Sequence, residues 1–323
     1  MDKIAILTSG GDASGMNATI AYLTKYAIAK QLEVFYVKNG YYGLYHNHFI
    51  TSKELDLTDF FFMGGTVIGS SRFKQFQDPS LRKQAVLNLK KRGINNLVVI
   101  GGDGSYMGAK ALSELGLNCF CLPGTIDNDV NSSEFTIGFW TALEAIRVNV
   151  EAIYHTTKSH NRLAIIEVMG RDCSDLTIFG GLATNASFVV TSKNSLDLNG
   201  FEKAVRKVLQ FQNYCVVLVS ENIYGKNGLP SLEMVKEHFE NNAIKCNLVS
   251  LGHTQRGFSP NSIELFQISL MAKHTIDLVV NNANSQVIGM KNNQAVNYDF
   301  NTAFNLPKAD RTKLLNQVNT AII

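Results

Sequence analysis

The chain has 323 residues, of which 45% are hydrophobic and 18% are charged, and its formal net charge is +3. At ~150 residues per domain, the length predicts about two domains, and the composition is that of a globular chain rather than a disordered one. The near balance of 30 basic and 27 acidic residues argues against a nucleic-acid or membrane-surface partner. No apolar run approaches the ~20 residues that span a bilayer, and polar residues follow the first apolar segment too soon for a signal peptide.

The five cysteines are odd in number and form no C-x-x-C pair. They predict small buried hydrophobic side chains rather than metal ligands, because no second Cys or His pair completes a site. We therefore expect a reducing, cytoplasmic setting. The cysteines are Cys119, Cys121, Cys173, Cys215 and Cys246.

In the first part of the chain, short apolar runs alternate with segments of helical period. Strands are expected at residues 3–7, 32–37, 97–100 and 118–122. Helices are expected at residues 16–30, 79–92 and 107–115. Asp78 is the expected N-cap of the second helix, with Pro79 at its first position.

The pattern repeats after a long helix expected at residues 140–158. Strands are expected at 162–168, 215–219, 247–251 and 286–290, and a further helix at 260–280. Apolar strands that alternate with helices indicate parallel sheets covered on both faces. The sequence thus predicts an α/β protein with two doubly wound lobes, and the lobe boundary is placed near Gly138 from the change of pattern.

Three turns rich in glycine and aspartate follow expected strands, at residues 9–12, 101–105 and 123–129. Glycines there permit positive φ and let a phosphate approach the backbone, while a helix N-terminus offers unpaired N–H groups. Because ligands of such sheets bind beyond the carboxyl ends of the strands, the turns are expected to converge on one crevice. None is a Walker A loop or a complete G-x-G-x-x-G motif.

Asp127 and Asp129 lie two residues apart just past a strand end. Turn capping is one interpretation, since Asp and Asn favour turns. In the other, one carboxylate removes a proton from a substrate hydroxyl while the other helps to hold Mg²⁺ on nucleotide phosphates, with Asp103 as a second metal ligand.

Four arginines lie in turns of small or polar residues, where a solvated helix face is not the default. A guanidinium pairs bidentately with phosphate, so these arginines together with the glycine turns favour phosphoryl transfer. They are Arg72, Arg162, Arg171 and Arg256.

Six motifs in order carry a resemblance: Thr-Ser-Gly-Gly-Asp at 8–12, Ser-Arg-Phe at 71–73, Gly-Gly-Asp-Gly-Ser at 101–105, Pro-Gly-Thr-Ile-Asp-Asn-Asp at 123–129, Met-Gly-Arg at 169–171 and Gly-His-Thr-Gln-Arg-Gly at 252–257. From residue 3 to at least residue 290 the chain resembles the bacterial ATP-dependent 6-phosphofructokinases. The resemblance implies transfer of the ATP γ-phosphoryl group to the 1-hydroxyl of fructose 6-phosphate in glycolysis. It also implies a cytoplasmic homotetramer with subunit-shared active sites.

The resemblance further implies a nucleotide lobe at residues 1–138 with about 252–302, and a sugar-phosphate lobe at residues 139–251 with about 303–323. The implied nucleotide contacts are Gly11, Tyr41, Arg72, Phe73, Gly102, Asp103, Gly104 and Ser105. Mg²⁺ is expected at Asp103 and Asp129, and the catalytic residues are expected to be the base Asp127, the orienting Thr125 and the cation Arg171.

The implied sugar-phosphate contacts are Thr125, Ile126, Asp127, Arg162, Met169, Gly170, Arg171, Glu221, His253, Thr254, Gln255 and Arg256. Of these, Arg162 is expected from the neighbouring subunit. Asn247 replaces a second cross-subunit arginine of the family, and Lys245, two residues earlier on the same face of a strand, is expected to substitute for it in part.

Other positions also depart from the family. Ser14 replaces a common proline, and Ser174 and Phe258 replace common glycines. Many bacterial relatives bind ADP or phosphoenolpyruvate at a second site lined by cations. The matching positions here are Ala21, Lys25, Glu54, Tyr154, Ser187, Gln210 and Gln212, so this allosteric site is expected to be degenerate.

Several alternatives compete with this interpretation. A pyrophosphate-dependent relative would carry bulkier residues in the nucleotide loops, whereas Gly104 and Gly124 are retained. A kinase that shares only the Gly-Gly-Asp-Gly turn, such as an NAD kinase, would not need the Asp127 block or the His253 turn. A non-catalytic subunit would have lost Asp127 or Arg171, and a nicotinamide oxidoreductase would carry the full dinucleotide fingerprint.

Overall fold

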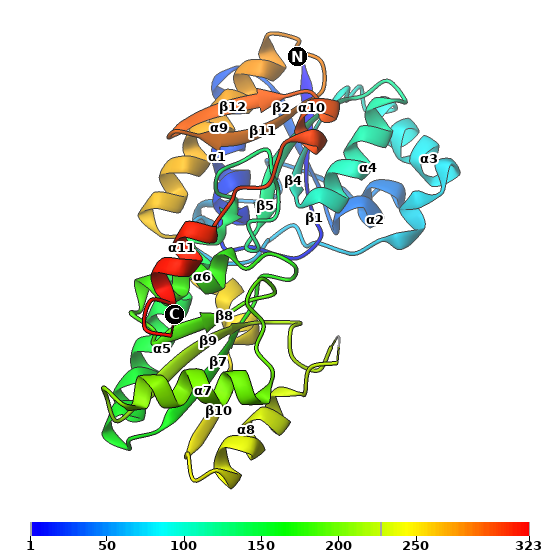
Figure 1. Ribbon diagram of the computed structural model, residues 1–323. Helices are drawn as coiled ribbons and strands as arrows, with labels where there is room; N and C mark the ends of the chain where they lie inside the picture. Colours follow the sequence, from blue (N-terminus) through cyan, green and yellow to red (C-terminus); the bar gives the residue numbers. More distant parts are fainter. Residues whose placement is uncertain (1, 227, 323) are drawn as a thin grey trace. The chain divides into compact units, whose positions relative to one another are not determined.

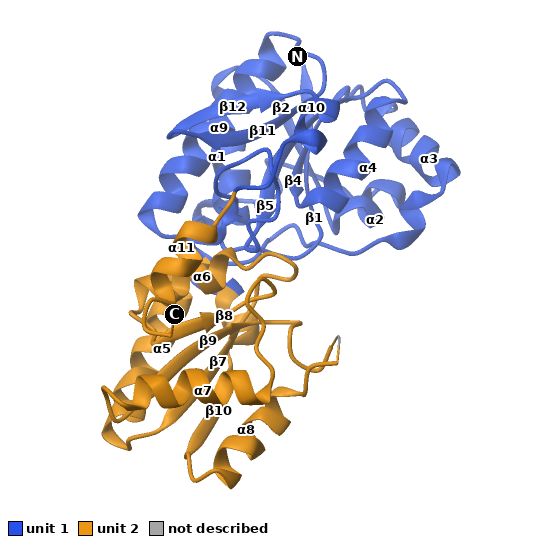
Figure 2. Ribbon diagram, in the orientation of Figure 1, with its two compact units in different colours: residues 1–141, 256–309 blue, residues 142–255, 310–323 orange. Residues whose placement is uncertain are grey.

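In the computed structural model, which describes residues 2–226 and 228–322, the chain forms two compact units. Unit 1 comprises residues 1–141 and 256–309, and unit 2 comprises residues 142–255 and 310–323 (Figure 2). The limits fall after Thr141, Gln255 and Ala309, a few residues beyond the expected positions 138, 251 and 302.

Unit 1 is built on a sheet with the strand order β12-β11-β5-β4-β1-β2-β3, with β6 paired to β5 (Figure 1). The strands are β1 (Lys3–Ser9), β2 (Glu33–Val37), β3 (Phe49–Thr51), β4 (Asn96–Gly101), β5 (Asn118–Thr125), β6 (Ile137–Gly138), β11 (Gln286–Lys291) and β12 (Gln294–Tyr298). The edge strands β3 and β12 run antiparallel to their neighbours, which corrects the expectation of a wholly parallel sheet. Their side chains are partly exposed, as suits sheet edges.

The central strands are buried on both faces, as their uninterrupted apolar runs predict. Ala5 and Leu7 of β1 pack in one core cluster, and the alternating Ile4 and Ile6 are fully buried on the opposite face. The helices are α1 (Met16–Ala29), α2 (Gly40–Tyr45), α3 (Pro79–Lys90), α4 (Asp103–Ser113), α9 (Ser262–Val280) and α10 (Phe300–Asn305), with 3-10 turns η1 (Thr58–Phe60) and η2 (Lys74–Gln77). In Figure 1, α1 and α9 lie on one side of the sheet and α2 to α4 on the other.

Two helix starts show how local sequence sets the boundaries. The Asp78 carboxylate accepts from the Ser80 N–H at 2.8 Å, which confirms the predicted N-cap of α3. Helix α4 begins at Asp103, four residues before the predicted start, because the extended Gly102 serves as its N-cap. The glycine-rich turn is therefore the first turn of the helix itself.

Unit 2 contains a four-stranded parallel sheet with the order β10-β7-β9-β8. Its strands are β7 (Leu163–Val168), β8 (Phe188–Val190), β9 (Cys215–Ser220) and β10 (Cys246–Ser250). Its helices are α6 (Asp175–Ala183), α7 (Leu198–Leu209), α8 (Leu232–Asn241) and α11 (Thr312–Val318). The 3-10 turn η3 (Gly252–Arg256) follows β10.

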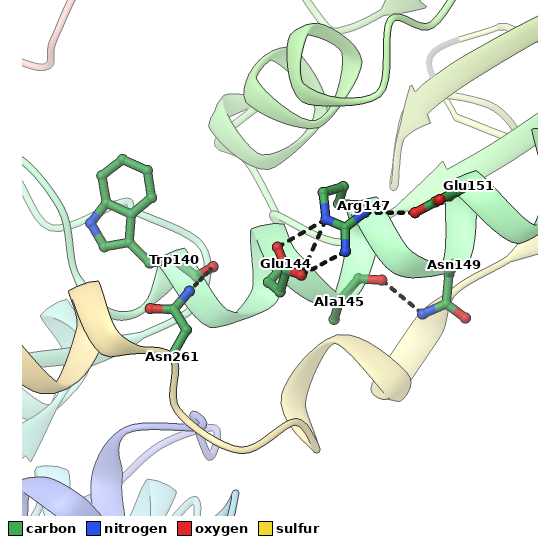
Figure 3. A network of polar contacts seen from close by, with 7 residues as sticks. All are labelled: Trp140, Glu144, Ala145, Arg147, Asn149, Glu151 and Asn261. Carbon is green, nitrogen blue, oxygen red and sulfur yellow. Dashed lines mark hydrogen bonds and ion pairs between the residues drawn. The ribbon is translucent and has the colours of Figure 1, made fainter.

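Helix α5 (Phe139–Ser159) begins in unit 1 and continues into unit 2. At its start, Asn261 donates to the Trp140 carbonyl at 3.0 Å (Figure 3). Further along, the Arg147 guanidinium bonds Glu144 and Glu151 at 2.8 and 2.6 Å. Because these i,i+3 and i,i+4 pairs are exposed to solvent, they support the helix only weakly.

The cysteines are free thiols, and four of the five are buried, whereas Cys173 is partly exposed. Cys119 and Cys121 lie in β5 and belong to the core cluster, as predicted. Within residues 2–226 and 228–322, none of the helices has the length and hydropathy needed to cross a bilayer.

Candidate functional site

The predicted glycine turns of unit 1 meet at the carboxyl ends of the strands, because β5, β4 and β1 are parallel neighbours in the sheet. The Ser105 hydroxyl donates to the Ser9 carbonyl at 3.2 Å and so ties the second turn to the first. Gly101 cannot carry a side chain, since a Cβ there would lie 2.5 Å from the Ser105 hydroxyl and 2.6 Å from the Ser9 oxygen. The convergence of the turns at the sheet edge is thereby confirmed.

Gly104 and Gly124 differ in the space around them. A Cβ on Gly104 would have no atom within 4 Å, so this position faces open space at the N-terminus of α4. A Cβ on Gly124 would meet Ile100 at 2.8 Å, the Gly101 amide at 3.0 Å and Met16 at 3.1 Å. The expectation that both glycines leave room for a ligand therefore holds only for Gly104, because Gly124 is required for close strand packing.

Tyr41 lies behind the phosphate-type turn rather than on its surface. Its side chain is buried, its hydroxyl donates to the Ser105 carbonyl at 2.6 Å, and its ring stacks on Phe76. Gly108 must be a glycine, since a Cβ there would lie 2.8 Å from the Tyr41 ring. Burial holds the pKa of Tyr41 well above its usual range, so the phenol stays a hydrogen-bond donor.

Residues 61–73, which we call the strap, bring Arg72 and Phe73 to the same carboxyl ends of the strands. The buried Asn17 of α1 donates to the Met63 and Gly64 carbonyls and accepts from the Val67 N–H at 2.6 Å. Thr8 adds bonds to Thr66 and Gly69, and Ser70 donates to the Gly10 carbonyl at 2.7 Å. Sequence reasoning found Arg72 and Phe73 but missed Asn17, whose signal is an amide on the apolar face of α1.

The Thr125–Asp129 segment is held in one conformation by its own polar groups. Thr125 and Asp127 are buried, and the Asp127 N–H donates to the Thr125 hydroxyl at 3.2 Å. Asn128 has a left-handed φ of 54°, and its side chain accepts from the Thr136 N–H at 3.0 Å. Thr136 donates in turn to the Thr125 carbonyl at 2.6 Å. Asn128 and Thr136 therefore both take part in capping this turn.

Asp103 and Asp129 both lie around the buried Tyr106 hydroxyl. Burial raises the pKa of Tyr106, and the charges of the two carboxylates raise it further. Among the described residues, one oxygen of Asp129 is buried without a hydrogen-bond partner, and the Tyr106 hydroxyl lies beside the Ser132 hydroxyl. No group of three His, Cys, Asp or Glu side chains that could hold a metal occurs there. Two carboxylates fit Mg²⁺, which keeps several waters and takes its other ligands from substrate phosphates.

Arg256 is the first residue of the second stretch of unit 1, and its side chain reaches the first glycine turn. Its Nη1 donates to the Asp12 carbonyl at 2.6 Å. The guanidinium also covers Gly11, where a Cβ would lie 3.0 Å from Nη1. Arg256, expected from sequence to meet a phosphate of the acceptor, thus contacts the turn expected to bind the donor.

In unit 2, a second constellation forms at the carboxyl ends of β7 and β9. One Glu221 oxygen accepts from the Gly170 and Arg171 N–H groups at 3.1 and 2.7 Å, and Gln255 accepts from the Met169 N–H at 3.3 Å. Arg171 adopts a left-handed φ of 55° and exposes its side chain to 71%. Glu221 therefore shapes the turn that presents Arg171, a role that sequence reasoning did not assign to it.

A second cationic group of unit 2 lies where β7 and β10 begin. Arg162 donates to the Asn247 side chain at 3.4 Å, and the Leu163 N–H donates to the Lys245 carbonyl at 2.9 Å. Cys246 packs in the unit 2 core, so the alternating Lys245 and Asn247 face the other side of the sheet, with Arg162. His253 and Thr254 are exposed on the following 3-10 turn.

Comparison with known proteins identifies the family. A family model described as phosphofructokinase matches residues 3–279. A probable ATP-dependent 6-phosphofructokinase of Mycoplasma pneumoniae is 66% identical over 321 residues, which cover 99% of this chain and 98% of that protein.

Two solved structures share the fold. A Saccharomyces cerevisiae phosphofructokinase superposes with a TM-score of 0.87 and 28% identity over 100% of this chain, which spans about half (48%) of that longer one. A pyrophosphate-dependent phosphofructokinase from Marinobacter aquaeolei superposes over 100% of this chain and 92% of its own, with a TM-score of 0.85 and 18% identity. The sequence match, which extends over the turns and carboxylates described above, shows that this chain belongs to the phosphofructokinase family.

Proposed function

We propose that this protein transfers the γ-phosphoryl group of ATP to the 1-hydroxyl of fructose 6-phosphate, giving fructose 1,6-bisphosphate and ADP. The proposal rests on the carboxyl ends of β4 and β5 in unit 1. There the turn of Gly104, which faces open space, adjoins the buried side chains of Thr125 and Asp127. The high identity to the Mycoplasma pneumoniae relative, whose name states this activity, supports the same reaction. Kinase, transferase and glycolytic roles follow from it.

The donor is expected to lie against Gly11, Arg72, Phe73 and the turn of Gly102, Asp103, Gly104 and Ser105. Tyr41 acts from behind this turn, through its bond to the Ser105 carbonyl. Backbone N–H groups at the start of α4 suit phosphate oxygens because the helix dipole and the unpaired donors both favour an anion.

Asp127 is the proposed general base, which accepts the proton of the acceptor hydroxyl as that oxygen attacks. Thr125 holds the backbone of Asp127 through the hydrogen bond at 3.2 Å and so orients the carboxylate. Arg171 stabilises the negative charge of the transferring phosphoryl group, and its guanidinium is exposed, with only a long contact of 4.0 Å to the exposed Asp172 carboxylate.

Mg²⁺ is the proposed metal cofactor, held by Asp103 and Asp129. When bound, it neutralises charge on the donor phosphates. The support is the hard oxygen donor set and the buried Asp129 oxygen that lacks a hydrogen-bond partner among the described residues.

The identity of the donor is open to a direct test. Gly104 faces open space, which supports ATP over pyrophosphate, and the pyrophosphate-dependent neighbour shares the fold at only 18% identity. A coupled assay with fructose 6-phosphate, Mg²⁺ and either ATP or pyrophosphate decides the question. Turnover with pyrophosphate comparable to that with ATP would overturn the proposal.

The acceptor is proposed to contact Ile126, Met169, Gly170 and Glu221 along the sugar, and Arg162, His253, Thr254, Gln255 and Arg256 around the 6-phosphate. Asn247 supplies no charge, so Lys245, which shares a sheet face with Arg162, is the proposed additional cation. Lys245→Ala should then raise the KM for fructose 6-phosphate and leave the KM for ATP unchanged, with the partly exposed Lys236→Ala of α8 as the control. An unchanged sugar KM would remove Lys245 from the site.

We also propose a cytoplasmic homotetramer whose active sites are shared between subunits. The family resemblance and the five free thiols support this setting. Light scattering coupled to gel filtration tests the assembly, and a monomer with full activity would contradict the shared site.

A further inference from the structure

Two hydrogen bonds join residues of unit 1 that are far apart in the sequence. Ser14, which stands where the family commonly has proline, is fully buried, and its hydroxyl donates to the Arg256 carbonyl at 3.1 Å. The Arg256 guanidinium donates back to the Asp12 carbonyl at 2.6 Å. We call Asp12, Ser14 and Arg256 the clasp.

The clasp holds the main chain of Arg256 in place, while several N–H donors of its guanidinium remain available to a ligand. Ser14 holds the Arg256 carbonyl, and the strap packs against the next residues, since a Cβ on Gly64 would lie 2.9 Å from the Gly257 oxygen and 3.0 Å from the Phe258 oxygen. A guanidinium carries five N–H donors, of which the Asp12 carbonyl engages one group. The side chain can therefore bind a phosphate from a fixed main-chain position.

The clasp also links two binding functions. Arg256 covers Gly11 and bonds Asp12, both in the turn proposed for the donor, while its own proposed ligand is the acceptor phosphate. A phosphate that draws the guanidinium toward itself must weaken the bond to the Asp12 carbonyl. A change in that bond acts directly on the first glycine turn, because Asp12 belongs to this turn.

We propose that Ser14 is a positioning residue for Arg256, and that the clasp couples acceptor-phosphate binding to the donor turn. This inference rests on the proposed function. A proline at position 14, which the resemblance implies for many members of the family, would have no side-chain donor, so it could not make the bond that Ser14 makes here. Because coupling between two ligands is reciprocal, each substrate should alter the affinity of the other through the clasp.

The first test separates KM from kcat. Ser14→Ala leaves the Arg256 carbonyl without its donor, and the loss of one such bond should raise the KM for fructose 6-phosphate about fivefold. The kcat should change less than about twofold, because Ser14 touches no reacting atom. Ser285→Ala is the matched control, since that hydroxyl bonds Cys119 and Leu117 at the other end of β5. An equal rise of KM in the control would overturn the proposal.

A double-mutant cycle tests the link between the two residues. Arg256→Lys keeps the charge but loses the fork that reaches both Asp12 and a phosphate. If Ser14 acts through Arg256, Ser14→Ala should add little to the KM of the Arg256→Lys variant. Additive effects on KM would show that Ser14 acts independently and would refute the positioning role.

Amide hydrogen exchange tests the coupling by a measurement that does not depend on turnover. Fructose 6-phosphate alone should change amide exchange in residues 10–16 of the native protein, and this change should be lost in Ser14→Ala. Unchanged exchange at residues 10–16, in a protein that does turn over the sugar phosphate, would refute the coupling. A protein inactive with ATP and fructose 6-phosphate would refute the proposed function, while faster exchange at residues 256–258 in Ser14→Ala would still support the clasp.

Discussion

Asp127 and Glu264 are two buried carboxyl groups of unit 1 with different surroundings. Asp127 stands at the end of β5, at the edge where the glycine turns meet. Glu264 accepts from the Gly138 N–H at 2.8 Å and from the Thr141 N–H and hydroxyl at 3.2 Å. Asp127 is the carboxyl group that we propose as the general base, whereas Glu264 joins the start of α5 to the start of α9.

Asp127→Asn tests the base. The amide has nearly the same size but cannot accept a proton, so kcat should fall by ~10²–10⁴ while both KM values stay within a few-fold. Steady-state kinetics measure kcat and both KM values separately, and Asp197→Asn, at the exposed N-cap of α7, is the control. A loss confined to KM would identify Asp127 as a binding group instead.

Glu264 should make stability depend on pH. Burial raises the pKa of Glu264 to about 7, above its ordinary value of 4.5, so the native state holds a proton that the unfolded chain releases. The contribution of Glu264 to the free energy of unfolding is then fully present below pH 4.5. It is lost as the pH rises through 7, which lowers the free energy of unfolding by on the order of 3 kcal/mol.

Urea unfolding at pH 5 and pH 8 measures this dependence. Glu264→Gln, which cannot ionise, should be less stable at pH 5, because one amide oxygen cannot accept from both Gly138 and Thr141. Its stability should change much less between the two pH values than that of the native protein. An equal fall in both proteins would assign the pH dependence to other groups.

At the scale of elements, helix α1 does more than cover the sheet. Its apolar face packs in the core, while Asn17 on that face holds the strap through three hydrogen bonds. The strap in turn carries Arg72 and Phe73 to the edge of the sheet. A helix that is otherwise a packing element thereby sets the position of a binding segment.

Asn17→Ala should loosen the strap. Its loss leaves the Val67 N–H and two carbonyls without partners, which costs about 1–3 kcal/mol of stability. The KM for ATP should rise more than the KM for fructose 6-phosphate, because Arg72 and Phe73 are proposed to contact ATP. Denaturant midpoints and paired kinetics measure both effects, with exposed Asn241→Ala as control. A destabilised variant with an unchanged KM for ATP would show that the strap does not position the donor.

At the scale of the whole molecule, we expect regulation to differ from that of many bacterial relatives. In unit 2, the Tyr154 and Tyr214 hydroxyls lie 2.5 Å apart, and this bond raises the pKa of Tyr214 to about 12. Gln212 donates to the Ser187 hydroxyl at 3.2 Å. In unit 1, the Glu54 carboxylate accepts from the N–H and hydroxyl of Thr51. Within each unit these side chains are engaged in the hydrogen bonds just given. Of the seven matching positions, only Lys25 carries a positive charge.

We therefore expect neither phosphoenolpyruvate nor ADP to shift the saturation curve for fructose 6-phosphate. An effector without differential affinity for two states cannot change their balance. Rates at low fructose 6-phosphate, with and without each compound, measure the response, and varying ATP separates competition by ADP at the active site. Activation by ADP or sigmoidal inhibition by phosphoenolpyruvate would contradict the expectation.

The sequence by itself determined the fold class and the ordered motifs. Apolar runs such as 97–100 identify buried parallel strands, because only strands covered on both faces lack polar alternation. Glycine and aspartate at their ends mark the functional edge, and Asp78 marks the start of α3. These signals are local, so neighbouring residues suffice to recognise them.

Only the tertiary structure decided which partners the polar groups have. Ser14 and Arg256 are 242 residues apart, Asn17 reaches 46–50 residues along the chain, and Glu264 caps a helix that begins 125 residues earlier. The same holds for Gly124, where the close approach of β4, not a ligand, excludes a side chain. Hydrogen bonds and close packing depend on distances in space, and a sequence pattern records only distances along the chain.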